Sequence, residues 1–169
     1  MAARRWILLL ALLLAGALMS AEHTYQGYID GVKSGNIVTC TWVKLAVERH
    51  VQDLARAGKK EFLYHFDEAL ADRAIDFVQQ LRHTKGIWAS SYGGRDTRIT
   101  LEPWEQFIVA MLHGWRNEAG YRRFTRAYVE VARKNGKTTL GAALGNLAFF
   151  ADRPKEMGGG ARLGMMNIA

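Results

Sequence analysis

The stretch that decides the fold is FTRAYVEVARKNGKTTLGAALGNLAFF, residues 124–150. Residues 128–131 are a short β-prone run, residues 132–136 are polar and end in glycine, and leucines at helical spacing follow from Lys137 onward. This order predicts a strand, a loop and a helix. A loop in that position can point its backbone N–H groups at an anion, and the positive end of the following helix adds to the attraction. The stretch therefore predicts a phosphate-binding loop.

The loop matches the pattern G-x-x-x-x-G-K-[ST] except that Val131 stands where the first glycine belongs. Gly136 permits close approach of the backbone to a phosphate, Lys137 can reach the β and γ phosphates of ATP, and the Thr138 hydroxyl can ligate Mg²⁺. An ordinary basic turn is the alternative interpretation. The expected phosphate-binding residues are Val131, Ala132, Arg133, Lys134, Asn135, Gly136, Lys137, Thr138 and Thr139.

Three amphipathic helices are predicted ahead of this unit, which makes the chain a mixed α/β domain. The first covers residues 40–57, the second is capped by Asp67 and ends near residues 84–86, and the third begins at Pro103. The expected buried stripes are Val43, Val47, Val51 and Leu54 in the first, Leu70, Ala74, Phe77, Val78 and Leu81 in the second, and Trp104, Phe107, Ile108, Met111, Leu112 and Trp115 in the third.

The composition limits the class of protein. A length of 169 residues fits one domain, and 23 Lys and Arg against 16 Asp and Glu give a formal net charge of +7. That charge favours an anionic partner such as a nucleic acid, a nucleotide phosphate or an acidic membrane. The single cysteine, Cys40, excludes an intramolecular disulfide framework, and the five histidines are not paired at the spacings that metal sites use.

Four blocks carry a resemblance to a known family. They are residues 28–54, residues 71–88, LEPWEQFIVAMLHGW at 101–115 and YRRFTRAYVEVARKNGKTTLGAALG at 121–145, in order and without large gaps. Together they resemble the N-terminal part of the large terminase subunit of tailed phages, the motor that packages DNA into the capsid. The resemblance implies the N-terminal part of a P-loop ATPase domain, with preceding helices and a small, incomplete parallel sheet.

The same resemblance implies roles for individual residues. Members of the family depart from the loop consensus at the first glycine in the same way as Val131. A basic residue inside their loop is thought to sense or stabilise the γ-phosphate, and Arg133 is the matching residue here. The expected catalytic residues are therefore Arg133 and Lys137. A guanidinium suits that task because it stays charged and can form paired hydrogen bonds to phosphate oxygens. The implied cofactors are ATP and Mg²⁺, with Thr138 as the metal ligand.

The family usually has a glutamine directly after the tryptophan of its Pro-Trp block, where it contacts adenine. This chain reads Trp104-Glu105-Gln106, and these three residues are the expected base contacts. A glutamine can pair with both N6–H and N7 of adenine, whereas a carboxylate can only accept from N6–H. The alternative is that Glu105 and Gln106 merely begin a solvated helix face.

The implied partners are ATP, double-stranded phage DNA, the small terminase subunit and the portal protein, and the implied location is the host cytoplasm. Family members continue through a Walker B acid pair and a nuclease domain. This sequence ends 32 residues after Lys137, so we expect a truncated, ATP-binding fragment of the motor that lacks the residues for hydrolysis.

The two ends of the chain differ from the domain between them. Arg4 and Arg5 precede an apolar run over residues 6–19, which has the pattern of a secretory signal peptide and falls short of the roughly 20 residues of a membrane-spanning helix. Export therefore stays possible, and only then is a membrane partner expected. The expected division is residues 1–22, a signal-like or non-family segment, residues 23–152, the terminase-like domain, and residues 153–169, an irregular glycine-rich tail.

Two other functions stay open on the sequence. One is an exported or membrane-tethered basic domain in which Gly-Lys-Thr is incidental, and signal cleavage would identify it. The other is a non-motor nucleic-acid-binding module, which steep salt dependence without nucleotide dependence would identify. Its phosphate-contacting stripe would be Arg122, Arg123, Arg126, Arg133 and Lys134.

Overall fold

The computed structural model describes residues 24–91 and 96–151. In this part of the chain the structure is mostly helical, with five α-helices, one short 3-10 helix and two short strands. The elements are α2 (Tyr25–Ser34), α3 (Thr41–Arg56), β1 (Tyr64–Phe66), α4 (Glu68–Gln80), η1 (Ile87–Ala89), α5 (Pro103–Gly114), β2 (Trp115–Asn117) and α6 (Lys137–Phe150).

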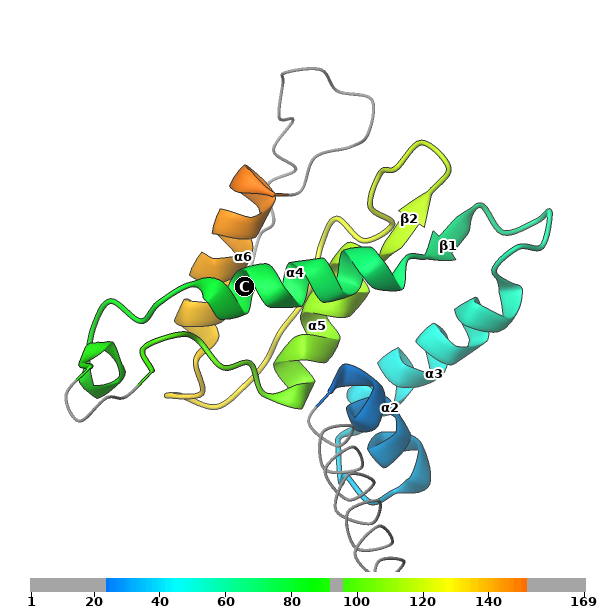
Figure 1. Ribbon diagram of the computed structural model, residues 1–169. Coiled ribbons are helices and arrows are strands. Elements are labelled where there is room, and N and C mark those ends of the chain that lie inside the picture. The colour runs from blue at the N-terminus through cyan, green and yellow to red at the C-terminus, as the bar shows by residue number, and fades with distance from the viewer. Residues whose placement is uncertain (1–23, 92–95, 152–169) are drawn as a thin grey trace, which may run out of the picture.

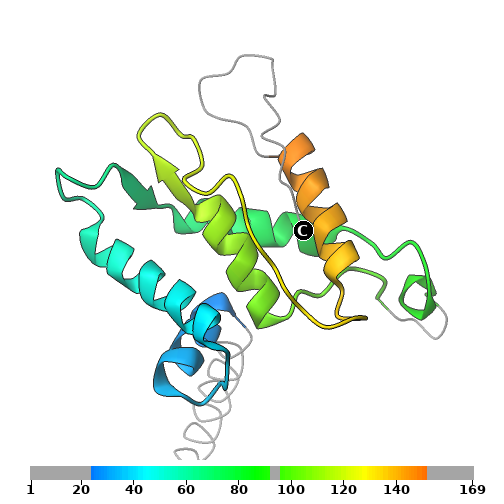
Figure 2. The same cartoon turned by 180° about the vertical axis from the view of Figure 1, so that it is seen from behind.

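Helix α5 lies at the centre. It packs against α4 and against α2, and α6 packs on α4. Figures 1 and 2, which view the molecule from opposite sides, both show α2 and α3 on one side of α5 and α6 on the other. The sequence explains the central place, because α5 is apolar around most of its circumference and a helix of that kind is buried. Its buried residues are Glu105, Gln106, Phe107, Val109, Ala110, Met111, Leu112, His113 and Gly114.

The three predicted upstream helices are confirmed. Pro103 is the first residue of α5, and Asp67 caps α4 by accepting a hydrogen bond from Leu70 N at 3.0 Å. The second helix ends at Gln80, earlier than the expected residues 84–86. The expected stripe of α3 is partly wrong, because Leu54 is 44% exposed whereas Val47, His50 and Asp53 are buried.

The prediction of a small parallel sheet is wrong. The two strands that the structure describes, β1 and β2, pair antiparallel, with Tyr64 opposite Asn117 and Phe66 opposite Trp115. Strand β1 lies at the N-terminal end of α4 and β2 at the C-terminal end of α5, so their pairing brings these two helix ends together. Gly114 permits this close approach, since a methyl group on it would collide with the Phe66 ring. A P-loop fold is not confirmed by this arrangement.

The predicted strand at residues 128–131 does not form. These residues pair with no strand in the part of the chain that the structure describes, and Tyr128 is 76% exposed, so the expectation of a buried strand is also wrong. The physical reason is that a strand requires a neighbouring strand for its N–H and C=O groups, and no described segment supplies one here. The expected exposure of residues 132–136 is confirmed.

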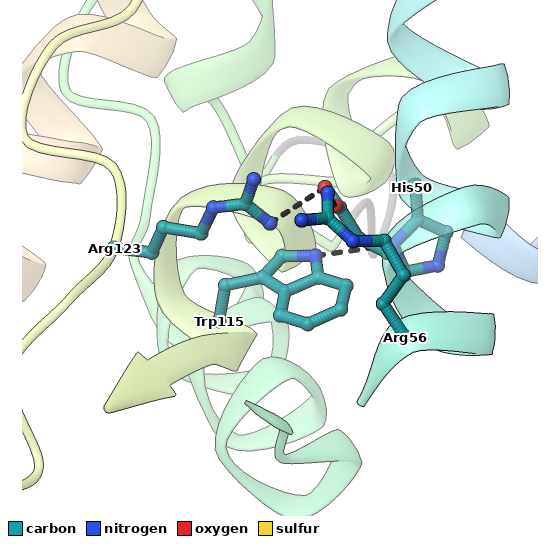
Figure 3. Close-up of polar contacts among 5 residues, drawn as sticks. His50, Arg56, Trp115 and Arg123 are labelled. Atoms are coloured by element: carbon teal, nitrogen blue, oxygen red, sulfur yellow. Dashed lines mark hydrogen bonds and ion pairs between the residues drawn. The ribbon is translucent and has the colours of Figure 1, made fainter. Parts of the chain in front are cut away.

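A buried ion pair fixes the position of the chain that leads to the loop. Arg123 Nη1 donates to Asp53 Oδ2 at 2.6 Å, joining the segment after β2 to the C-terminal half of α3, 70 residues away (Figure 3). Asp53 is only 2% exposed. Arg56 adds a longer contact of 3.4 Å to the same carboxylate. Aromatic rings surround the Arg123 guanidinium at centroid distances of 4.9–5.4 Å: Phe62, Tyr64, Trp115 and Phe124.

Beside this pair, the fully buried Trp115 donates through Nε1 to His50 Nδ1 at 3.1 Å (Figure 3). The bond requires an unprotonated Nδ1. Burial lowers the pKa of His50 to about 4, although the nearby Asp53 carboxylate acts in the opposite direction. His50 is therefore neutral in the folded protein at neutral pH.

The expected signal-like segment, residues 1–22, and the expected tail, residues 153–169, lie outside the described residues. Among the helices that the structure describes, none is long and apolar enough to cross a membrane.

We predict that Asp53→Ala lowers the free energy of unfolding by about 2–4 kcal/mol, because it leaves the Arg123 guanidinium in an apolar surrounding without its counter-charge. Chemical denaturation followed by circular dichroism measures the change. The matched control is Arg56→Ala, which removes a partner that is 57% exposed and should cost less than about 1 kcal/mol. Equal losses for the two variants would contradict the central place of the Asp53–Arg123 pair.

We predict that acid destabilises the fold through His50. Between the pKa of about 6.5 in the unfolded chain and about 4 in the folded one, the unfolded chain binds the proton more tightly, so the free energy of unfolding falls as the pH falls through this range. The full contribution is on the order of 3 kcal/mol. Denaturation at several pH values should show a shallower decline for His50→Gln than for the wild type. His65→Gln, at an exposed position of β1, should keep the wild-type decline.

Candidate functional site: the loop before α6

The loop before α6 turns through two left-handed residues. Lys134 has φ of 69° and Gly136 has φ of 70°. Gly136 is the N-cap of α6, and its carbonyl accepts from Leu140 N at 2.8 Å, which closes the first helical turn. Gly136 adopts the left-handed conformation without strain because it has no side chain. Lys134 adopts the same conformation at a cost in conformational energy. The loop is thus a tight turn that delivers the chain directly into a helix.

Lys137 bends back over this loop. Its Nζ donates to the Val131 carbonyl oxygen at 3.4 Å, so the ammonium group lies across the loop from the residue that replaces the first glycine of the pattern. Lys137 and Thr138 are exposed and Thr139 is half-buried. The first N–H groups of α6, which have no acceptor within the helix itself, and the Lys137 ammonium group therefore occur together on an accessible surface.

Buried leucines hold α6 in place behind the loop. Leu140, Leu144 and Leu147 are each 5% exposed or less, as the predicted stripe requires. Residues 127 and 129 line an apolar crevice of about 10 Å³ with Ile108 and Leu112 of α5 and with Lys137, Leu140, Gly141 and Leu144 of α6. The segment before the loop, which was expected to form a strand, thus lies beside both helices. The crevice is too small for any part of a nucleotide.

Glu105 lies against the loop. Its Oε2 accepts from Glu102 N at 3.0 Å in a capping box at the start of α5, and a methyl group placed on Gly136 would lie 3.2 Å from its Oε1. Only 9% of Glu105 is exposed, and burial raises the pKa of its carboxyl group, with the nearby Glu102 carboxylate adding in the same direction. A buried carboxyl group therefore stands beside Gly136, the N-cap residue of α6.

Gln106 points elsewhere. Its Nε2 donates to the Leu101 carbonyl oxygen at 3.0 Å, and it lines a groove of about 710 Å³ with residues of α2 and α4. The side chains of Glu105 and Gln106 thus separate, one toward the loop and one away from it. Both are buried, so the alternative that they begin a solvated helix face is wrong. Trp104 is half-buried on the first turn of α5, and a role for these three residues in base contact stays a prediction.

The sequence analysis missed two contacts, one between Glu105 and Gly136 and one between Asp53 and Arg123. Glu105 precedes Gly136 by 31 residues, and no periodicity or spacing connects the two. Asp53 follows His50 by one helical turn on the face of Val47, so a polar residue inside an apolar stripe was the available signal for the buried ion pair. The pair also changes the expected basic stripe, because Arg123 is engaged with Asp53 inside the protein.

Metal ligands do not cluster in the part of the chain that the structure describes: no group of three or more His, Cys, Asp or Glu side chains is placed to hold a metal ion there. Thr138, the expected metal ligand, is exposed, and its role stays a prediction.

The family comparison bears on the same part of the molecule. Residues 103–158 match the family model described as terminase large subunit, ATPase domain. The match begins at the first residue of α5 and includes Glu105, the loop and α6. It does not extend to residues 28–54 or 71–88, for which the resemblance stays a prediction. Neither a curated protein nor a solved structure matches the chain. The similarity of this chain to terminase large subunit ATPase domains therefore covers residues 103–158, which hold α5, the loop and α6.

Proposed function

We propose that the loop of residues 131–138 binds the phosphates of ATP, as the nucleotide-binding part of a phage DNA-packaging motor. The observation that carries this proposal is the position of Lys137. Its ammonium group lies over a turn that ends in Gly136, at the start of α6, and one face of that helix is buried. The turn and the helix both lie within the residues that match the ATPase family. A lysine, free backbone N–H groups and a helix N-terminus are the components of phosphate recognition.

The residues around the loop fit a magnesium complex of the nucleotide. Thr138 offers an accessible hydroxyl, and Glu105 offers the buried carboxyl group beside Gly136. Mg²⁺ carried on the phosphates would neutralise part of their charge. Arg133 is exposed in the turn itself, where its guanidinium can approach the γ-phosphate from the loop side.

The remaining parts of the proposal follow from the family. A packaging ATPase acts on double-stranded DNA in the host cytoplasm together with a small terminase subunit and a portal protein, and we assign this chain to that setting. The formal charge of +7 suits an anionic partner of this kind. The signal-like segment at residues 1–22 has no part in the proposal.

We predict that Lys137→Ala lowers the affinity for Mg²⁺-ATP by about tenfold to a hundredfold, because one charge-assisted phosphate contact contributes roughly 1.5–3 kcal/mol. Titration of the full chain with a fluorescent ATP analogue measures this. The control is Lys44→Ala, which removes an exposed lysine of α3 and should bind like the wild type. If Lys137→Ala binds as well as the control, the loop is an ordinary basic turn.

We predict that the purified 169-residue chain binds ATP without turning it over. Phosphoryl transfer to water requires carboxylates that hold the Mg²⁺ shell and position the attacking water. Of the residues that the structure describes, Glu105 is the carboxylate placed against Gly136, and it is also engaged at the start of α5. Phosphate release should stay at background with or without DNA. Turnover that disappears in Lys137→Ala would refute this prediction.

A further inference from the structure

Two helices begin at nearly the same place. The capping box at the start of α5 holds the Glu105 carboxyl group by one oxygen, Oε2, at 3.0 Å from Glu102 N. The other oxygen, Oε1, faces Gly136 at the start of α6. A helix N-terminus attracts negative charge, so this carboxylate stands at the end of α6 where an anion is favoured.

A phosphate bound at the same helix start would approach this carboxylate. The two anions would repel each other in a poorly solvated place, since Glu105 is 9% exposed. Burial also raises the pKa of Glu105, because a poorly solvated place disfavours the charged form of its carboxyl group. Movement of the side chain is opposed by its bond to Glu102 N, which would be lost.

From this juxtaposition we propose that Glu105 is a selectivity residue of the loop: its carboxylate disfavours a phosphate that arrives without a divalent cation and so makes nucleotide binding depend on Mg²⁺. This inference rests on the proposed function, because it requires ATP phosphates at Gly136 and Lys137. Under this proposal the Glu105 carboxylate interacts electrostatically with the phosphate–metal complex. This role replaces the base contact that was expected from its position after Trp104.

The test compares two dissociation constants for the same preparation of the full chain. A fluorescent ATP analogue is titrated once with excess Mg²⁺ and once with excess EDTA. The wild type should bind the magnesium complex more tightly. Glu105→Gln keeps the size of the side chain and an oxygen that can accept from Glu102 N, and it removes the charge. We expect it to bind the metal-free analogue about tenfold more tightly than the wild type and to lose most of the difference between the two conditions.

The ratio of the two constants separates a charge effect from a structural one. Partial unfolding of a variant lowers the apparent affinity in both conditions alike and leaves the ratio unchanged. The matched control is Glu48→Gln, which removes an exposed carboxylate of α3 and should keep the wild-type ratio. An unchanged ratio in Glu105→Gln, or an equal change in Glu48→Gln, would overturn the inference.

Different results would reject the role of Glu105 and the proposed function of the loop. If Lys137→Ala abolishes binding while Glu105→Gln leaves the dependence on Mg²⁺ unchanged, the loop binds nucleotide and only the role of Glu105 is wrong. If Lys137→Ala has no effect in either condition, the proposed function is wrong and the inference is wrong with it.

Discussion

The buried ion pair between Asp53 and Arg123 is the contact on which the arrangement of the described chain depends. It joins α3 to the segment after β2, two parts of the sequence separated by 70 residues. A carboxylate that is 2% exposed would be costly without a partner, so this bond selects one position for the chain that leaves β2. From there the chain runs along α5 and α6 to the loop, as Figure 1 shows.

The aromatic surroundings make the ion pair specific to arginine. A planar guanidinium can stack on rings and donate to a carboxylate at once, whereas the compact ammonium of a lysine cannot do both. Trp115 takes part twice, since it packs near Arg123 and donates to His50. The same tryptophan begins β2 opposite Phe66. The Trp115 side chain therefore couples three features: the pairing of β1 with β2, the burial of α3, and the position of the segment that leads to the loop.

The loop itself depends on a second constraint, the meeting of two helix starts. Gly136 is required there for two reasons that act together: its φ of 70° disfavours other residues, and a side chain would press on Glu105. Glu105 in turn satisfies a backbone N–H at the start of α5. A residue in the first turn of the central helix thus contacts the proposed phosphate site, and α5 connects that site to the core.

The sequence by itself determined α3, α4, α5 and α6, but not α2 or the two strands. Asp67 and Pro103 marked helix starts, leucine spacing marked α6, and Gly136-Lys137 marked the exposed turn before it, because caps, periodicity and turn residues act over a few positions along the chain. The resemblance to the terminase family was also visible in consecutive residues, and the family match over residues 103–158 supports it. These features are local, because they depend on interactions between residues that are close together in the sequence.

Only the tertiary structure decided the rest. Residues 128–131 have the composition of a strand, but a strand depends on a partner, and among the described residues no neighbour pairs with them. Asp53 and Glu105 carry charges that composition places at the surface, yet both are buried, one against Arg123 and the other against Gly136. Each partner lies 31 to 70 positions away, and which distant groups meet is determined by the packing of the helices around α5, a physical outcome that no short stretch of sequence encodes.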